Sequence, residues 1–190
     1  MRTHPPSQTV STPSATILHM SPTALPSAEN VFTWPVRVYW EDTNAGGIVF
    51  YANYLKYFER ARTEWLRALG IAQSALQQTQ GCIFVVSDVQ LKYLRSARLD
   101  DQLLVTAQLV EMGRSSFTLR QEASLLTADN PDANASPVLC RATVRIGCVN
   151  SQTHKPTRIP GTVLDVLNAT APGKISHDAR ALRTAPDQPT

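Results

Sequence analysis

A polar turn that contains two glycines is the part of this sequence whose residue types and spacing best suit chemistry. It runs from Asp42 to Tyr51 and joins a predicted strand to a predicted helix. Gly46 and Gly47 let the backbone come close to a ligand, and a helix start supplies free N–H groups and the positive end of a dipole. Such a turn can hold a carbonyl oxygen and stabilise the negative charge that develops on it during acyl transfer.

Carboxylates that could act on a bound carbonyl lie on both sides of this turn. Glu41 and Asp42 precede it, and Glu59 and Glu64 follow it along the helix. General acid–base and nucleophilic catalysis both need such groups close to the reacting atom. A Gly-Gly turn before a helix is also an ordinary connection, so the residues alone leave both a site and a simple connection open.

Hydrophobic periodicity predicts the elements that must position the turn. Residues 34–40 alternate with a period of two, which is typical of a strand. The apolar face of that strand is predicted to hold Val36, Val38 and Trp40. An amphipathic helix follows, with Asn53 as a candidate N-cap and Gly70 at its C-terminal end. Its apolar residues recur at helical spacing and are Tyr54, Phe58, Ala61, Trp65 and Leu69.

Four further strands are predicted from alternating apolar residues. They cover residues 83–95, 102–110, 116–126 and 137–149. In the first of them, the apolar face is predicted to hold Val85, Val89, Leu91 and Tyr93. Consecutive long strands after one helix favour an antiparallel sheet with the helix packed along one face, which is an α+β domain. Cys140 and Cys148 in the last strand share its apolar face, so we interpret them as core residues.

The folded domain is predicted to span residues 31–169. Residues 1–30 are rich in Pro, Ser and Thr and carry few charges, so we expect a disordered N-terminal extension. A signal peptide is the rival interpretation, but a basic start followed by an apolar run is missing. Translation from Met20 is a further alternative. Residues 170–190 show no periodicity and are predicted to form a disordered tail.

Composition and charge exclude several classes of function. The chain has 18 Lys and Arg against 15 Asp and Glu, without a basic stripe, which argues against a nucleic-acid-binding protein. It has no run of about 18 apolar residues, so no transmembrane helix is expected. Its three cysteines form no C-x-x-C pair and have no histidine nearby. We therefore expect no metal site and no other cofactor, and a reducing compartment.

The segment RVYWEDTNAGGIVFYANYLKYFERARTEWLR resembles the YbgC family of hotdog-fold acyl-CoA thioesterases. The stretch LKYLRSARLDDQLLVTAQL is similar to the same family, and the resemblance covers residues 31–165. It implies a hotdog fold, which is a curved antiparallel sheet wrapped around one long helix, in homodimers whose sheets join and which commonly pair into tetramers. It also implies hydrolysis of an acyl-CoA or acyl carrier protein thioester. The implied setting is the cytoplasm, with an alternative at the periphery of the inner membrane and an association with the Tol-Pal cell-envelope system.

The resemblance assigns roles to residues of the turn. The family motif reads E-D-T-D-x-G-G-[IV]-V, and its second Asp is the catalytic carboxylate that attacks the thioester or activates water. Asn44 occupies that position in this chain. Asp42 matches the motif, as do the substrate-binding positions Gly47, Ile48 and Val49.

Three more positions are implied by the resemblance. The backbone N–H of Tyr51, at the helix start, is the expected oxyanion donor, and 4-hydroxybenzoyl-CoA thioesterases also carry Tyr there. In the family, basic residues near the strand connections contact the phosphates of the substrate. Arg114 in EMGRSSF matches one such position, and Lys155 in HKPTRIP is a looser candidate.

Asn44 departs from the family motif, because an amide is neither a general base nor a carboxylate nucleophile. In one hypothesis Glu59 acts instead, since another hotdog thioesterase subgroup uses a helix Glu eight residues beyond its oxyanion donor. The structural alternative for Glu59 is a surface or interface ion pair with Arg60, Arg62 or a residue of a partner subunit. In a second hypothesis Asn44 orients a water that Asp42 deprotonates, which gives slow hydrolysis. In a third, the chain binds acyl thioesters without turning them over.

Other features of the sequence leave fewer alternatives. The four histidines avoid the centre of the predicted domain, so a hotdog dehydratase, which needs a central His, is not expected. We interpret the three tryptophans, Trp34, Trp40 and Trp65, as core or interface residues. A place in the lining of an acyl pocket is the alternative. An unrelated binding module that only shares the fold stays as a further hypothesis, since a fold does not fix a function.

Overall fold

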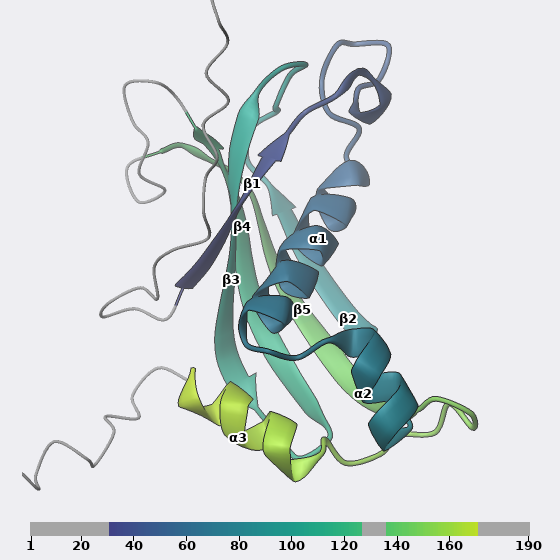
Figure 1. The fold of residues 1–190 in the computed structure, drawn as a ribbon. Coiled ribbons are helices and arrows are strands. Elements are labelled where there is room, and N and C mark those ends of the chain that lie inside the picture. The colour runs from purple at the N-terminus through teal and green to yellow at the C-terminus, as the bar shows by residue number, and fades with distance from the viewer. Residues whose placement is uncertain (1–30, 127–135, 171–190) are drawn as a thin grey trace, which may run out of the picture.

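A computed structural model describes residues 31–126 and 136–170 and arranges them as one sheet with three helices (Figure 1). The strands are β1 (Val31–Arg37), β2 (Cys82–Tyr93), β3 (Gln102–Met112), β4 (Ser116–Leu126) and β5 (Val138–Asn150). The helices are α1 (Asn53–Ala68), α2 (Gln73–Gln80) and α3 (Gly161–Ala169), with a 3-10 turn η1 (Trp40–Asp42). The predicted order of one strand, one long helix and four strands is confirmed. Of the segments predicted to be disordered, 1–30 and 170–190, all residues but Thr170 lie outside the described residues, and Thr170 is the C-cap of α3.

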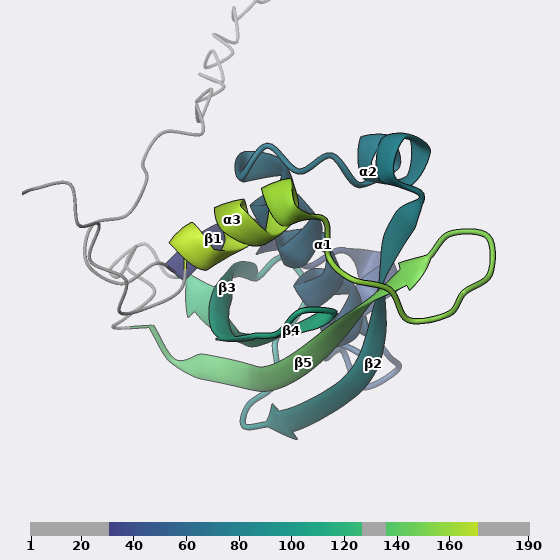
Figure 2. The ribbon, with the colours of Figure 1, turned by 90° about the horizontal axis from the view of Figure 1, so that it is seen from below.

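The five strands follow the order β1-β3-β4-β5-β2, and every neighbouring pair is antiparallel. Seen from below, the sheet curves around α1 (Figure 2). This is the curved antiparallel sheet around one long helix that the resemblance implies. No helix in the described ranges is long and apolar enough to cross a membrane.

The apolar face of α1 packs against the inner face of the sheet. Its buried residues include four of the five predicted positions, Tyr54, Phe58, Ala61 and Trp65. Alternating residues of β3 and β5 meet them from the sheet, and these are Leu103, Val105, Ala107, Leu109, Cys140, Ala142, Val144, Ile146 and Cys148. The helix lies over β1, β3 and β4, whereas β2 is contacted by α2. The inner face of β2 is therefore the least covered part of the sheet.

One buried polar residue links the helix to the sheet. The Gln121 side chain of β4 is fully buried and donates to the carbonyl oxygens of Phe58 (3.0 Å) and Thr106 (3.2 Å). Its own carbonyl oxygen accepts a bond from the Arg62 guanidinium at 2.9 Å. Because every polar atom of this side chain is paired, α1 is held at one position along β3 and β4.

The first predicted strand ends earlier than its alternation suggests. β1 stops at Arg37, and the chain then leaves the sheet and enters η1. Val36 and Val38 are buried as predicted, but Trp40 is 78% exposed, so its predicted place on the buried face is wrong. The change of direction at η1 is what carries the chain toward the start of α1.

Two other local features differ from the periodicity. A register shift between Val86 and Asp88 places Val86 and Val89 opposite the inward residues Ile146 and Val144, so Val85 faces away. The predicted alternation of β2 is correct only after this bulge. The helices α2 and α3 were not predicted. In α2 only Leu76 is buried, and one apolar position gives no helical periodicity by which a helix could be identified.

The cysteines of β5 are core residues, as expected. Cys140 is fully buried and Cys148 nearly so, and no disulfide involves the three cysteines. Burial raises the pKa of each of these two thiols to about 12. They therefore remain neutral thiols at physiological pH and pack as small apolar side chains.

We expect Gln121→Leu to lower the free energy of unfolding by about 2–4 kcal/mol, because it removes the hydrogen bonds that Gln121 makes to the half-buried Arg62 guanidinium and to the carbonyls of Phe58 and Thr106. Urea denaturation measures this change. Gln90→Leu, at an exposed position of β2, is the matched control and should stay within about 0.5 kcal/mol of wild type. Equal effects of the two substitutions would show that the Gln121 network does not hold the helix.

Candidate active site

Asp42 joins the two ends of the Gly-Gly turn. Its backbone carbonyl oxygen accepts from Phe50 N (2.8 Å) and from the Asn53 side-chain amide (2.9 Å). Its carboxylate accepts from Tyr39 N at 2.9 Å. Asp42 is only 3% exposed. Burial of the neighbouring Tyr57 hydroxyl raises the pKa of that group, and the charge of Asp42 raises it further. One buried residue thus fixes the entry of the turn, its exit and the first turn of α1.

This arrangement changes the interpretation of two predicted residues. Asn53 was a candidate N-cap, but Ala52 occupies that position, and the Asn53 side chain bonds Asp42 instead of the helix N–H groups. Asp42 was a candidate base for a water at Asn44. The structure places its carboxylate in the interior, bonded to Tyr39 N, where it holds the turn and does not face solvent.

Asn44 forms a small hydrogen-bonded turn of its own. The side-chain oxygen of Asn44 accepts from Gly46 N at 2.9 Å, and its backbone bonds Ile48 O and Gly47 N, both at 2.9 Å. Gly47 has a φ of +70°, a conformation that side chains other than Gly rarely adopt. A Cβ atom at Gly46 would come within 3.2 Å of the Asn44 side-chain oxygen. Both glycines therefore have local reasons to be glycine.

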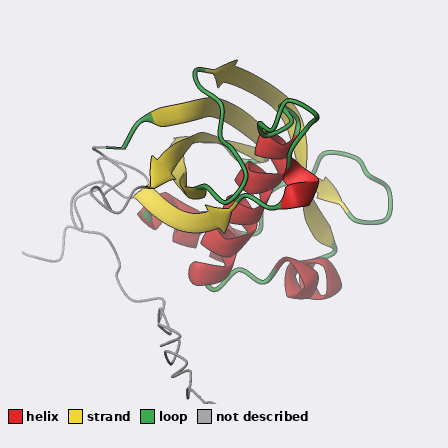
Figure 3. Ribbon diagram, turned by 90° about the horizontal axis from the view of Figure 1, so that it is seen from above, coloured by secondary structure: helices red, strands yellow, loops and turns green. Residues whose placement is uncertain are grey.

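The loop before β3 supports this turn from outside. Val49 N donates to Ala97 O at 2.9 Å, and Ile48 forms an antiparallel bridge with Arg98. A second bridge joins Thr43 to Val49 across the turn. Figure 3 looks down on this end of the molecule, where the loops lie beside the start of α1. Ile48 and Val49, predicted substrate-binding positions, are thus fixed by the backbone.

Tyr51 presents an unused backbone donor at the start of α1. The N–H groups of Phe50 and Asn53 are bonded within the turn, but Tyr51 N has no hydrogen-bond partner among the described residues. The tyrosine is 62% exposed, and α1 continues behind it for 16 residues. A free N–H at the positive end of a helix dipole is the arrangement that stabilises an oxyanion.

Two features lie between α1 and β2. Beside Tyr51, the rings of Phe50, Tyr51 and Tyr93 form a partly exposed cluster, with centroids 4.5 Å apart for Phe50–Tyr51 and 6.3 Å for Tyr51–Tyr93. Further along α1 lies a groove, a cavity of about 140 Å³. Its mostly apolar lining includes Trp65, Leu66, Phe84, Val86, Phe117, Leu119 and Ile146.

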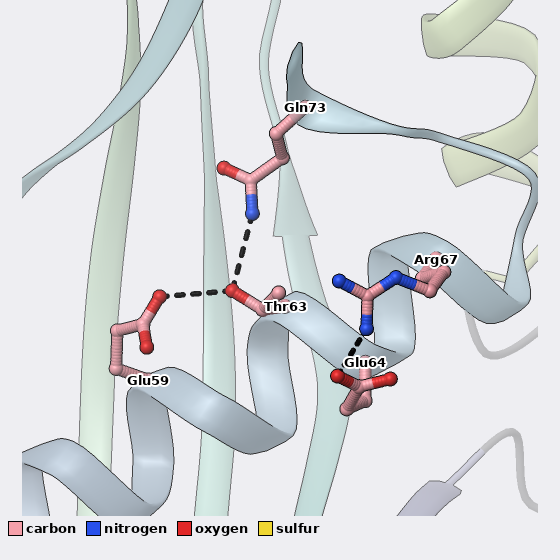
Figure 4. Close-up of polar contacts among 5 residues, drawn as sticks. All are labelled: Glu59, Thr63, Glu64, Arg67 and Gln73. Carbon is pink, nitrogen blue, oxygen red and sulfur yellow. Dashed lines mark hydrogen bonds and ion pairs between the residues drawn. The ribbon is translucent and has the colours of Figure 1, made fainter. Parts of the chain in front are cut away.

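Glu59 and Arg62 lie on the α1 side of the same cavity. The Glu59 carboxylate accepts from the Thr63 hydroxyl (2.8 Å), which in turn accepts from the Gln73 amide at 3.1 Å (Figure 4). No ion pair of Glu59 with Arg60 or Arg62 forms within the described residues; the ion pair of α1 joins Arg67 to Glu64. Burial lowers the pKa of Arg62, and the charge of Glu59 partly offsets this.

The distance along α1 bears on the proposed role of Glu59. Tyr51 and Glu59 are separated by eight residues, which is about 12 Å along a helix. Within one protomer, the Glu59 carboxylate therefore lines the cavity and lies well away from Tyr51 N. Its catalytic role stays a prediction.

The two predicted phosphate-binding residues lie at the opposite end of the sheet. Arg114 follows β3, whose 11 residues span about 35 Å, while the Asn44 turn contacts the residues just before β3. Lys155 lies in the loop after β5 at the same far end, where Ile159 N bonds Arg114 O at 2.9 Å. One protomer thus brings Asn44 and Tyr51 together, but separates them from Arg114 and Lys155.

Sequence reasoning missed two residues of this region. Asn53 was identified only as a cap, and Tyr93 only as an inward residue of its strand. The described residues contain no group of three or more His, Cys, Asp and Glu side chains that could hold a metal ion.

Comparisons with known proteins agree with this geometry. A family model described as the thioesterase superfamily matches residues 46–127. "Acyl-CoA thioesterase YbgC" of Haemophilus influenzae is 39% identical over 135 residues, which cover 71% of this chain and 93% of that protein. "Acyl-CoA thioester hydrolase YbgC" of Escherichia coli is 37% identical over 134 residues, or 70% and 93% of the two chains. The chain belongs to the YbgC family of acyl-CoA thioesterases.

Solved structures place the YbgC-family chain in the hotdog fold. An aspartate-to-asparagine mutant of 4-hydroxybenzoyl-CoA thioesterase, crystallised with 4-hydroxybenzoyl-CoA, has a TM-score of 0.66 at 19% identity and covers 73% of this chain and 99% of its own. A 1,4-dihydroxy-2-naphthoyl-CoA thioesterase from Synechocystis has a TM-score of 0.63 at 20% identity, with 73% and 96% covered. At these identities the likeness concerns the fold.

We expect Gly47→Ala to lower the free energy of unfolding by about 1–2 kcal/mol, because alanine is strained at a φ of +70°. Thermal or urea denaturation provides the measurement. Gly161→Ala, at the start of α3 where an added Cβ meets nothing within 4 Å, should not destabilise the protein. A Gly47→Ala variant as stable as wild type would contradict the described turn.

Proposed function

We propose that this chain hydrolyses acyl-CoA thioesters to a free acid and a thiol, with the thioester carbonyl held on the Tyr51 N–H. The single observation that carries this placement is the unpartnered Tyr51 N–H just before the start of α1. Membership of the YbgC family supports the activity. Acyl carrier protein is an alternative thiol carrier, because the groove contacts only the acyl part that both donors share.

Position 44 carries Asn and not a carboxylate, and this determines the rate of hydrolysis that we propose. The Asn44 side-chain oxygen is already bonded to Gly46 N, so the amide nitrogen is the part that faces outward. An amide can hydrogen-bond a water or the thioester but cannot remove a proton. We therefore propose that Asn44 orients a water and that hydrolysis is slow.

A non-catalytic acyl-thioester binding protein is the second candidate function. It is favoured by the position of the other carboxylates: Asp42 is buried and Glu59 lies about 12 Å along the helix from Tyr51. Thiol release from short, long and aromatic acyl-CoAs separates the two functions. Slow turnover above the uncatalysed rate supports the hydrolase, whereas binding without release supports the binding protein.

We expect Asn44→Asp to raise kcat by about 100-fold or more, because one carboxylate oxygen can keep the Gly46 N–H bond while the other attacks the carbonyl or activates water. Asn168→Asp, the same chemical change on α3, is the control and should leave kcat unchanged. If Asn44→Asp has wild-type kcat in an active enzyme, the base lies elsewhere, and Glu59→Gln becomes the variant to measure.

We also propose that the active form is at least a homodimer, with tetramers as the family alternative. β2 is an edge strand paired only with β5, and its inward Val86 and Tyr93 are 48% and 47% exposed. Antiparallel pairing of two β2 strands would reverse one protomer relative to the other. The Arg114 and Lys155 end of the partner would then approach the Asn44 end of the first protomer, which would unite the thioester and phosphate sites.

We expect Val86→Arg to reduce the molar mass in solution from that of a dimer to that of a monomer, because it places a charge on the inner face beside the edge strand. Light scattering coupled to size exclusion measures this mass. Val110→Arg on β3, which is also exposed, should leave the oligomer intact. A wild-type chain that is monomeric at assay concentrations and fully active would contradict the shared site.

The cellular setting rests on the family resemblance. We propose a cytoplasmic location with a role in lipid metabolism. Contact with the inner membrane and the Tol-Pal system is the alternative. Fractionation of cells that express the full chain distinguishes the two.

A further inference from the structure

Tyr93 makes a contact with the oxyanion site that no comparison assigns. It is the last residue of β2, and its hydroxyl donates to the carbonyl oxygen of Tyr51 at 3.1 Å. Its ring meets the ring of Tyr51 edge-on, with centroids 6.3 Å apart, and that of Tyr54 at 5.9 Å. A side chain from the edge strand therefore contacts both the backbone and the ring of the residue that carries the free N–H.

A hydrogen bond to the Tyr51 carbonyl also restrains the N–H group of the same residue. Tyr51 lies in the two-residue turn before α1, and Leu55 N, in the first turn of the helix, bonds Ala52 O at 3.1 Å. The Tyr93 hydroxyl supplies the side-chain hydrogen bond to the Tyr51 carbonyl. Because the dihedrals of Tyr51 connect this carbonyl to its own N–H, fixing the carbonyl also limits the directions in which the N–H can point.

The other anchors of this segment act on its neighbours. Asn53 and Phe50 bond Asp42 from the interior side. Tyr54 accepts from Ala97 N at 3.1 Å, which fixes the helix start to the loop before β3. Tyr93 is thus the anchor on the groove side, and it ties Tyr51 to β2 and not to the loop.

We infer that Tyr93 is a positioning residue, whose hydroxyl orients the Tyr51 N–H toward the thioester carbonyl. This inference rests on the proposed function, in which the Tyr51 N–H is the oxyanion donor. An oxyanion donor must be aimed before the charge develops, so a donor that is free to turn stabilises the transition state less. A merely structural role is a poor alternative, because the hydrogen bond of Tyr93 is a single neutral one whose loss costs little stability.

Tyr93→Phe tests the inference with the loss of one oxygen atom. The ring and its contacts with Tyr51 and Tyr54 are retained, so the melting temperature should stay within about 2 °C of the parent. Made in the Asn44→Asp background, the variant should lower kcat about tenfold with KM unchanged, since the bond acts on the transition state and not on ground-state binding.

Ser87→Ala is the matched control, because it also removes a hydroxyl of β2 that bonds a backbone carbonyl, that of Arg145 at 3.3 Å. This variant should retain the kcat of the parent. Equal kcat for the parent and Tyr93→Phe would overturn the inference, and so would equal losses in Tyr93→Phe and Ser87→Ala.

A second measurement separates this inference from the proposed function. The amide ¹⁵N–¹H resonance of Tyr51, recorded without substrate, should move in Tyr93→Phe and stay in place in Ser87→Ala. If no acyl-CoA is hydrolysed by any variant but the resonance moves as expected, the proposed function fails and the positioning contact stands. If hydrolysis is observed and neither kcat nor the resonance changes, the proposed function stands and the positioning role is overturned.

Discussion

The carbonyl oxygen of Asp42 accepts two hydrogen bonds, from Phe50 N and from the Asn53 side chain, and the geometry of the site depends on this shared acceptor. The two bonds bring the start and the end of the turn to one buried point. They also determine which donors remain. Since Phe50 N is used by Asp42 and Asn53 N by Phe50 O, the N–H groups of Tyr51 and Ala52 between them are left without a partner in the part of the chain that the structure describes. The bonds that fix the turn therefore leave free the Tyr51 N–H that we propose as the oxyanion donor.

The groove between α1 and β2 follows from how α1 crosses the sheet. The sheet curves around the helix (Figure 2), which packs on β1, β3 and β4, whereas α2 packs on β2. Between α1 and the edge strand β2 lies the apolar cavity beside Glu59. The basic residues Arg114 and Lys155 lie at the other end of the sheet. The proposed homodimer would bring the partner's copy of that end toward Asn44.

Most of the fold could be predicted because its core is periodic. The apolar residues of α1 recur at helical spacing, and those of β3 and β5 alternate strictly, so each pattern identified its element. The bulge in β2 could not be predicted, since one extra residue leaves the composition of a strand unchanged while it reverses the faces. The end of β1 was also missed, because Trp40 continues the alternation of a strand that the backbone has already left.

The turn was predictable in position but not in its internal contacts, and its role as the site stays a prediction. Gly46 and Gly47 before a helix identified the turn, and the resemblance added Asn44 and Tyr51. The burial of Asp42 and the bond from Tyr93 are tertiary contacts between residues far apart in the chain, and neither has a local signature. Asp42 is therefore the residue whose surroundings differ most from the expectation: a carboxylate in a polar turn suggests a base, whereas the structure buries it and bonds it to the turn. Its catalytic role stays a prediction.

The most direct test of this account is a crystal structure of the chain with an acyl-CoA analogue in which a methylene replaces the thioester sulfur. The ketone oxygen of the analogue stands in for the thioester carbonyl. We predict that it lies within about 3 Å of Tyr51 N, with the acyl chain in the groove between α1 and β2. A bound analogue whose carbonyl is held elsewhere, with Tyr51 N still unpartnered, would contradict the central claim.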